Sequence, residues 1–309
     1  MRRTATLLAL VFATACTAWG ARASADDVAA SARAVAAAPR SMRAPTASDR
    51  ERRYWMADAY LAGGFNQLTL ALLAGLRYRI DQPRSDNVLL DNRRLEFGVE
   101  LNVNPGFTSV GGYVEWTPLQ VLVVRAQTDV YAHYGTYGAI MRFDQVTPAT
   151  TFRDELRDVC AGCRAGFVQR ALGRVALQAQ VGPVVLRNQL DVAAYVLHGD
   201  EPFYILIEHD ILAARSEIFV LDEVQLLLEP YRRPDRTGLY VGALYHFART
   251  LRAQVQRQRV GLFGEWVFRP RLGPFARPRL LGLAGYHVED RNRGGGFIGI
   301  VCMGSEFDL

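Results

Sequence analysis

The five histidines are the first residues to test for chemistry, because a hydrolase needs a general base such as histidine beside its serine nucleophile. No serine follows any of them in an H-x-S arrangement, and the G-x-S-x-G, H-E-x-x-H and phosphate-loop motifs are also missing. The sequence therefore predicts a protein that is not an enzyme. A lipid-modifying activity would need a Ser–His pair assembled from distant residues. The histidines are His133, His198, His209, His246 and His287.

Three neighbouring residues, Glu208, His209 and Asp210, are candidate metal ligands. Adjacent residues of a strand point to opposite faces, so only the two carboxylates could share a face. Two loop carboxylates could bind Ca²⁺ weakly, and a solvated loop explains the same residues. We therefore predict neither a metal nor a cofactor.

The cysteines offer one candidate disulfide. Cys160 and Cys163 form a C-x-x-C motif, and in an oxidising compartment they could pair and leave Cys302 free. No second cysteine pair is present in the sequence to complete a zinc ribbon. A local disulfide and two plain thiols both remain open.

Charged side chains recur at alternate positions of several apolar runs, so they share one face of each run. If the runs close into a barrel, this face lines the lumen. One interpretation is a water-filled passage whose excess of arginine favours anions. The other is a narrow lumen closed by arginine–carboxylate pairs. The candidate lumen-lining residues are Arg77, Arg79, Arg94, Glu96, Glu100, Arg125, Asp129, Arg174, Arg187, Asp191, Arg257, Arg259 and Glu265, with Arg170 on the same face.

The charges lie on segments with a period of two, which indicates β-strands. In 94–103 the odd positions are Leu, Phe, Val, Leu and Val, whereas the even positions are Arg, Glu, Gly, Glu and Asn. A helix would scatter both sets around its surface. Similar alternation occurs in 68–80, 122–131, 174–181, 186–196, 257–268 and 297–309.

Turn signals separate these runs, including Asn-Pro-Gly at 104–106 and Gly-Pro at 182–183. The region 202–229 mixes periods and is compatible with a helix or with strands. At roughly 20 to 22 residues per strand and loop, the chain holds about 10–12 strands, and 12 is preferred because single-chain bacterial barrels have even counts. Longer loops are predicted at 81–92, 135–164, 198–216 and 230–237.

The N-terminus predicts export. Arg2 and Arg3 precede a short apolar core at 5–15, and small residues allow cleavage after Ala25, so residues 1–25 form a predicted signal peptide. Cys16 leaves a lipoprotein open, in which an acyl chain would anchor the protein. Residues 26–53 are rich in Ala and Arg and predict a disordered periplasmic leader, followed by a barrel domain at 54–309.

The charge of the mature chain excludes one class of partner. Cleavage removes Arg2, Arg3 and Arg22 and no acidic residue, so the formal charge falls from +5 to +2. This charge is too small to indicate a nucleic-acid partner.

Strand length favours a membrane barrel over a soluble one. The runs span about 10–15 residues, near the ~9–11 that cross lipid at a tilt and longer than the ~5–6 of soluble strands. Aromatic residues gather near their ends, where a membrane barrel has its girdles. These residues are Tyr78, Phe107, Trp116, Tyr134, Tyr245, Trp266, Phe268 and Tyr286.

On the alternation, the short turn at Trp116–Leu119 and the final segment Phe297–Leu309, the chain resembles bacterial outer-membrane β-barrel proteins over about residues 66–309. The resemblance implies an all-β, transmembrane, antiparallel up-and-down barrel in the outer membrane of a Gram-negative bacterium. It also implies contact with outer-membrane lipid and with the barrel insertion machinery. Family members usually end in an aromatic residue, whereas this chain ends in Leu309, with Phe307 two residues earlier.

The sequence predicts a small, porin-like channel or uptake pore for polar or anionic solutes, with an arginine-rich lumen. One alternative is a non-conducting barrel that anchors loops or partners at the surface. The other is a soluble periplasmic β-rich protein or lipoprotein, in which the apolar strand faces pack against each other.

Overall fold

The computed structural model describes residues 52–65, 70–83, 85, 87–90, 92–134, 165–200, 202–206, 208–209, 211–232, 237–268, 271–272, 275–290 and 295–308. The predicted signal peptide, Cys16, and the Cys160–Cys163 motif lie outside these residues. The predictions made for them stay predictions.

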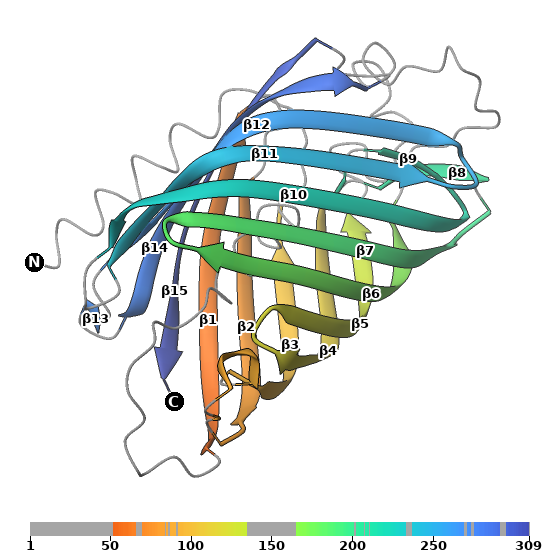
Figure 1. The fold of residues 1–309 in the computed structure, drawn as a ribbon. Coiled ribbons are helices and arrows are strands. Elements are labelled where there is room, and N and C mark those ends of the chain that lie inside the picture. The colour runs from red at the N-terminus through yellow and green to blue at the C-terminus, as the bar shows by residue number, and fades with distance from the viewer. Residues whose placement is uncertain are drawn as a thin grey trace, which may run out of the picture.

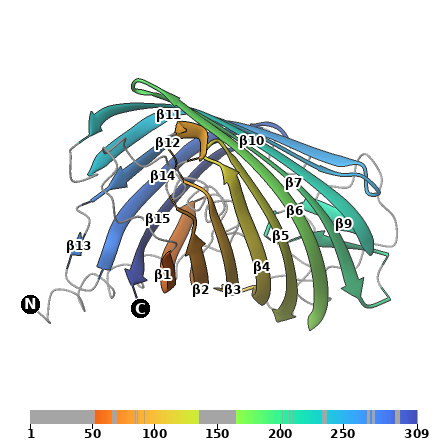
Figure 2. The ribbon, with the colours of Figure 1, turned by 60° about the horizontal axis from the view of Figure 1, so that its bottom comes forward.

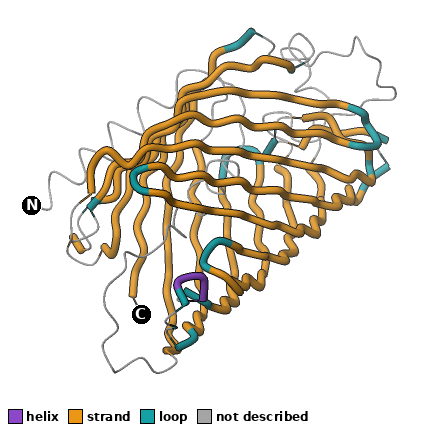
Figure 3. Tube along the Cα trace, viewed as in Figure 1, coloured by secondary structure: helices purple, strands orange, loops and turns teal. Residues whose placement is uncertain are grey.

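The described chain is almost entirely strand (Figure 3). Among its residues, no helix is long and apolar enough to cross a membrane. The strands are β1 (Arg52–Phe65), β2 (Leu70–Asp81), β3 (Arg94–Val103), β4 (Phe107–Leu119), β5 (Leu122–Tyr134), β6 (Ala165–Val181), β7 (Val184–His198), β8 (Phe203–Leu206), β9 (Ile211–Ala214), β10 (Ser216–Arg232), β11 (Gly238–Thr250), β12 (Val255–Val267), β13 (Arg271–Leu272), β14 (Phe275–Glu289) and β15 (Phe297–Asp308), with a short 3-10 turn at Val88–Leu90.

Twelve strands form one closed antiparallel barrel (Figures 1 and 2). Each strand pairs with the next in the order β1 to β7, β10, β11, β12, β14 and β15, and β15 pairs with β1. The two-residue strand β13 only extends the edge of β14, and β8 pairs with β9 in a separate hairpin. The predicted all-β up-and-down barrel of twelve strands is confirmed.

The two faces of the barrel wall differ as a membrane barrel requires. On β7, buried and exposed residues alternate along the whole strand, with Val192 45% exposed and Ala193 1% exposed. Each of the twelve barrel strands carries large apolar side chains on its exposed face. Exposing an apolar surface of this extent to water is unfavourable, so the outer surface has to face lipid.

Aromatic side chains gather on the outer surface at the end of the barrel where β1 begins and β15 ends, which we call the proximal end. Trp55 and Tyr78 lie 5.2 Å apart between ring centroids, and Trp266 stacks on Phe268 at 5.4 Å. Phe107, which the sequence suggested for such a girdle, is wholly buried inside the opposite, distal end. Phe107 lies at a strand end, as predicted, but its side chain is on the inner face.

The outer face of β7 and β10 contains one polar pair. Asn188 stands between the exposed Leu186 and Leu190, and its Nδ2 donates a hydrogen bond to Oδ1 of Asp222 at 2.7 Å. Lipid offers no hydrogen-bond partner, so the two side chains satisfy each other.

The region 202–229, left open between helix and strands, forms β8, β9 and most of β10. The chain also enters the barrel earlier than its alternation indicates, because β1 begins at Arg52. The outward positions of β1 include Ala57, Ala59 and Gly63, which give little apolar contrast with the inward positions.

A close contact between β3 and β4 leaves little room for a side chain at Gly98. A Cβ atom at Gly98 would lie 2.4 Å from Cε1 of Tyr113, and the Arg125 guanidinium covers the Tyr113 ring, with Cζ 3.7 Å from the ring centroid. Gly98→Ala is therefore expected to lower the free energy of unfolding in urea by about 1–3 kcal/mol, because the ring cannot move aside. Gly282→Ala is the control, since a Cβ there meets nothing within 4 Å. Equal effects of the two substitutions would contradict this packing.

Candidate functional site

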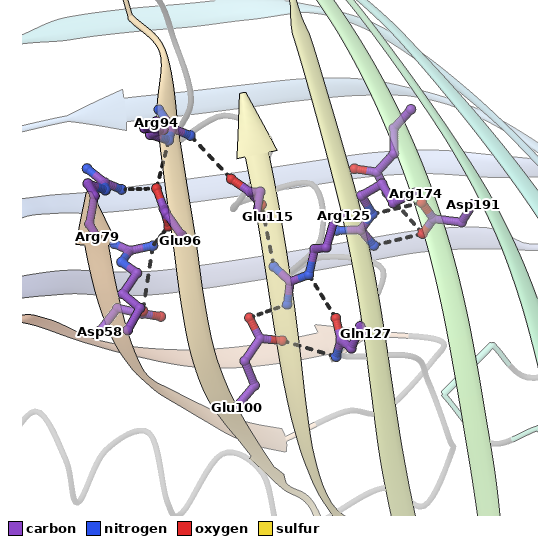
Figure 4. Close-up of polar contacts among 12 residues, drawn as sticks. Asp58, Arg79, Arg94, Glu96, Glu100, Glu115, Arg125, Gln127, Arg174 and Asp191 are labelled. Atoms are coloured by element: carbon purple, nitrogen blue, oxygen red, sulfur yellow. Dashed lines mark hydrogen bonds and ion pairs between the residues drawn. The ribbon is translucent and has the colours of Figure 1, made fainter. Parts of the chain in front are cut away.

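Ion pairs line the inner face of the wall from β2 to β7 (Figure 4). Glu96 on β3 is a centre of this network. Its Oε1 lies 2.7 Å from Nη2 of Arg79 and 2.7 Å from Nε of Arg94, and its Oε2 lies 4.0 Å from Nη1 of Arg77. Glu96 is only 2% exposed. Charge-assisted bonds therefore hold this part of the interior together.

The network continues along the neighbouring strands. Arg125 Nη2 lies 2.6 Å from Oε1 of Glu100, and Arg170 Nε donates to Oδ2 of Asp129 at 2.8 Å. Arg174 holds Asp191 with two bonds, from Nε to Oδ1 and from Nη2 to Oδ2, each 2.7 Å long. The register of the antiparallel strands places both partners of this last pair opposite each other.

Glu306 connects the network to the strands that close the barrel. Its Oε1 lies 3.3 Å from Nη2 of Arg77 on β2 and 3.5 Å from Nη2 of Arg279 on β14. Arg279 Nη1 in turn donates to Oε1 of Glu265 on β12 at 3.3 Å. The ion pairs therefore extend from β12 through β14 and β15 to β2.

The buried charges are not dominated by arginine. Among the described residues, eight arginines and eleven carboxylates are buried. The predicted arginine excess is therefore absent from this set, because six buried carboxylates were not assigned to the lumen from the sequence. They are Asp58, Glu208, Glu217, Glu223, Glu229 and Glu306.

The connection between β7 and β10 folds into the barrel as the inward hairpin, which we define as β8 and β9 with their turn. Because β7 ends at the distal end and β10 begins there, the hairpin enters from that end. Figure 1 shows β8 and β9 on the inner side of β10 to β12, and β9 contacts all three of these strands. Its buried side chains, each 0–2% exposed, are Tyr204, Ile205, Leu206, Ile211, Leu212 and Ala213.

The inward hairpin packs against apolar side chains from strands β4 to β12, so an apolar core lies inside the distal end of the barrel along these strands. Burial, with Glu208 and Glu217 nearby, raises the pKa of Tyr204 well above its usual value, which keeps the phenol neutral. The wall residues of this core include Phe107, Tyr131, Val168, Tyr195, Phe219, Ala248 and Val255.

Glu217, the second residue of β10, fastens the hairpin to the wall. Its side chain has no exposed surface, and its two carboxylate oxygens accept four backbone N–H bonds. Ala214 at the end of β9 donates to Oε2 at 2.9 Å, and Ile218 donates to Oε1 at 3.0 Å. Arg252 and Ala253, in the turn between β11 and β12, donate at 2.7 and 2.9 Å. One carboxylate thus joins the hairpin, β10 and a distal turn.

The tip of the hairpin meets polar groups of the wall. His209 stacks on Phe219 with ring centroids 4.2 Å apart, and its Nε2 lies 3.1 Å from the Tyr195 hydroxyl. The buried guanidinium of Arg257 donates to the backbone carbonyl of His209. These contacts fix the position of the tip above the charged interior.

Two adjoining cavities lie between the hairpin tip and the proximal end. Arg170, Arg174 and Gln178 are inward-facing residues that follow one another in this order along β6, which runs from the distal to the proximal end. The cavities therefore lie one after the other along this strand, toward the proximal end. The first is lined by His209, Tyr195, Arg170 and Asp191, and the second by Gln178, Arg187 and Gln225. Both are lined by Arg174, Gln189 and Glu223.

The structure places every sequence-predicted lumen residue on the inner face, but it divides them into separate groups. Arg77 to Asp129, with Arg174 and Asp191, belong to the ion-pair network. Arg257 contacts the hairpin, and Arg259 Nη2 donates to Nε2 of His246 at 2.8 Å. Arg187 belongs to neither group, because none of its nitrogens makes a hydrogen bond to a described residue.

Glu217 is a functional residue that the sequence did not reveal. It begins a segment whose inward positions mix apolar and charged residues, namely Glu217, Phe219, Leu221, Glu223, Gln225 and Leu227. Three of these six inward residues are apolar, which weakens the period-two contrast with the outward positions.

The candidate metal ligands around Glu208 are only partly within the described residues, so the prediction made for them stays a prediction. Among the described residues, no group of three or more His, Cys, Asp and Glu side chains could hold a metal ion. Glu208 and His209 are buried at the tip of the hairpin, whereas Asp210 lies outside the described residues.

The two faces of the closed twelve-strand barrel define the class of the protein. It is an outer-membrane β-barrel. The alternative of a soluble periplasmic protein is excluded, because the apolar strand faces point outward instead of packing against each other. Whether such a barrel is a channel or a non-conducting barrel depends on how its side chains fill the interior.

No family model matches the chain, and no curated protein matches it. Among solved structures, it is similar to the β domain of the Bordetella autotransporter BrkA, with 11% identity over 83% of this chain and 99% of that one and a TM-score of 0.41. The translocator domain of the autotransporter NalP from Neisseria meningitidis has 9% identity, over 92% and 96% of the two chains, and a TM-score of 0.39. An outer membrane channel from Pseudomonas putida F1 has 10% identity, over 86% and 100%, and a TM-score of 0.39. No activity is transferred from similarities this distant.

Proposed function

We propose that the barrel is a passage for small polar solutes and that the inward hairpin holds it closed in the resting state. The observation that carries the proposal is the position of the hairpin, which lies inside the distal end of the barrel. The wall around the interior carries ion pairs from β2 to β7 beside an apolar cluster from β1, β2, β7, β10 to β12, β14 and β15. Water-filled cavities and charged walls favour polar over apolar solutes. A hairpin that is not part of the wall can move without breaking the barrel.

The balance of buried charges sets the selectivity that we propose. Eleven buried carboxylates accompany eight buried arginines and the inward-facing Arg170 and Arg174, so the described interior has no net positive charge to select anions. The passage is proposed to admit small polar solutes of either sign. This differs from the anion preference that an arginine-rich lumen would give.

A non-conducting barrel is the second candidate, and one observation favours it. Arg187 on β7 reaches to within 4.0 Å of Glu265 on β12, although β10 and β11 separate these strands in the wall. Side chains therefore meet across part of the lumen, as expected of an interior that stabilises the wall and conducts nothing.

We also propose that the barrel has no catalytic activity. His246 accepts a hydrogen bond from Arg259, and Nδ1 of His287 lies 3.4 Å from Oδ2 of Asp290. These contacts suit structural roles. Release of fatty acid from phospholipid by the purified protein would contradict the proposal.

Solute flux into liposomes tests the passage. We compare the wild type with a variant in which residues 203–214 are replaced by a short Gly-Ser linker, after a gel-mobility shift on heating has shown that both are folded. The variant is expected to admit small polar solutes at least tenfold faster than the wild type. A folded variant as impermeable as the wild type would favour the non-conducting barrel.

A further inference from the structure

Arg187 differs from the other arginines of the interior. It is 4% exposed, and none of its three nitrogens makes a hydrogen bond to any described residue. The carboxylate oxygen Oε2 of Glu265 lies 4.0 Å from its Nη1, which is an ion pair without hydrogen-bond contact. Its Cζ also lies 5.6 Å from the ring centroid of Tyr240, at the long end of a cation–π contact.

Arg174, on the neighbouring strand β6, is a guanidinium of the same interior that has hydrogen-bond partners. It binds both oxygens of Asp191 at 2.7 Å. A guanidinium has five N–H donors in a fixed fork, and an unsatisfied buried charge costs several kcal/mol. The fork of Arg187 therefore calls for an acceptor that the described residues do not supply.

Arg187 lines the second cavity together with amide side chains of β7 and β10. Two amide oxygens there, Oε1 of Gln189 and Oε1 of Gln225, are buried and also have no hydrogen-bond partner among the described residues. The amide nitrogen of Gln225 is used by Glu223 at 2.7 Å, which leaves its oxygen as the free acceptor. The cavity wall thus offers unused donors at Arg187 and unused acceptors at two glutamines.

We propose that this cavity is a binding site for a small carboxylate that also bears a hydroxyl or amino group. The planar fork of Arg187 matches the two oxygens of a carboxylate. The oxygens of Gln189 and Gln225 accept hydrogen bonds from the donor group of the same molecule. This inference rests on the proposed function, because the ligand reaches the cavity through the passage. It adds one site that prefers carboxylates to an interior that has no net positive charge.

The test is calorimetric titration of the folded barrel in detergent with sodium glycolate, which has both a carboxylate and a hydroxyl. Sodium chloride at equal ionic strength is the reference, since it screens charge without fitting the fork. Wild type is expected to bind glycolate, and Arg187→Gln to bind it at least tenfold more weakly. The matched control is the double variant Arg170→Gln with Asp129→Asn, which removes an ion pair of the same interior whose two residues do not line this cavity, and it is expected to keep the affinity within about threefold.

Arg187→Lys provides a second variant in case the glutamine variant does not fold. It keeps the charge and loses the fork, so glycolate is again expected to bind at least tenfold more weakly. If wild type binds glycolate no better than chloride, or if all variants bind it equally, water satisfies Arg187 and the proposal is overturned. Binding by a barrel that passes no solute would leave the site standing and remove the passage instead.

Discussion

Glu217→Gln is expected to raise the open-to-closed ratio of the channel in a planar bilayer by roughly 100-fold. The carboxylate of Glu217 accepts four backbone N–H bonds, which join the inward hairpin to β10 and to the turn at Arg252 and Ala253. The amide replaces one accepting oxygen by an NH₂ group that faces two N–H donors. A loss of about 3 kcal/mol from these charge-assisted bonds corresponds to roughly 100-fold in the open-to-closed ratio.

The control for this prediction is Glu229→Gln. Glu229 is also a buried carboxylate of β10, but it lies near the proximal end, where its Oε2 accepts a bond from Gln180 Nε2 at 2.6 Å. The control substitution makes the same change in charge on the same strand, away from the hairpin. An equal rise in the open-to-closed ratio for both variants would mean that lumen charge, and not the attachment of the hairpin, controls the passage.

Glu96→Gln is expected to lower the free energy of unfolding by about 3–5 kcal/mol. Glu96 faces three arginines and is 2% exposed, so neutralising it leaves like charges close together with little water to screen them. Urea unfolding, followed by the loss of the heat-modifiable band and by tryptophan fluorescence, measures the change.

Glu289→Gln is the matched control for Glu96. Glu289 is an exposed carboxylate at the distal end of β14 that accepts bonds from Gln256 and Gln258, and its loss is expected to change stability by less than about 1 kcal/mol. A similarly small effect at Glu96 would show that water reaches the ion-pair network and that the resting interior is open.

The wall of the barrel could be predicted from the sequence because its two faces meet different surroundings. Lipid demands apolar residues at every second position, and β3 shows this contrast without interruption. The sequence pattern did not predict β1 as a strand, because alanine and glycine occupy several of its outward positions. The contrast also failed on β10, where Phe219, Leu221 and Leu227 face inward.

The hairpin could not be predicted, because it depends on what surrounds it. Ile205, Leu206, Ile211 and Leu212 form two short apolar runs that read equally well as a helix or as a pair of strands. Only the apolar distal ends of β4 to β12 make a buried hairpin favourable there. The role of Glu217 likewise arises from backbone N–H groups more than thirty residues away in the chain.

Charge balance could not be predicted for a related reason. Alternation assigns a face only where a strand has been recognised, so Asp58 on β1 and Glu223 on β10 were left out of the lumen. Both are buried inside it. The pairing of each arginine with its carboxylate depends on strand register, which aligns Arg79 with Glu96 and Arg174 with Asp191.

The most direct test of a passage beneath the hairpin is a block of current from within the lumen. Ala193 lines the cavity under the hairpin tip, and Ala193→Cys in the linker variant, with Cys160, Cys163 and Cys302 replaced by alanine, places a thiol there. Single-channel recording is expected to show steady current that falls irreversibly on addition of a charged, membrane-impermeant thiol reagent. The same variant with Ala193 retained is expected to keep its current. A folded linker variant without current, or a current that the reagent leaves unchanged in the Ala193→Cys variant, would contradict the proposed passage.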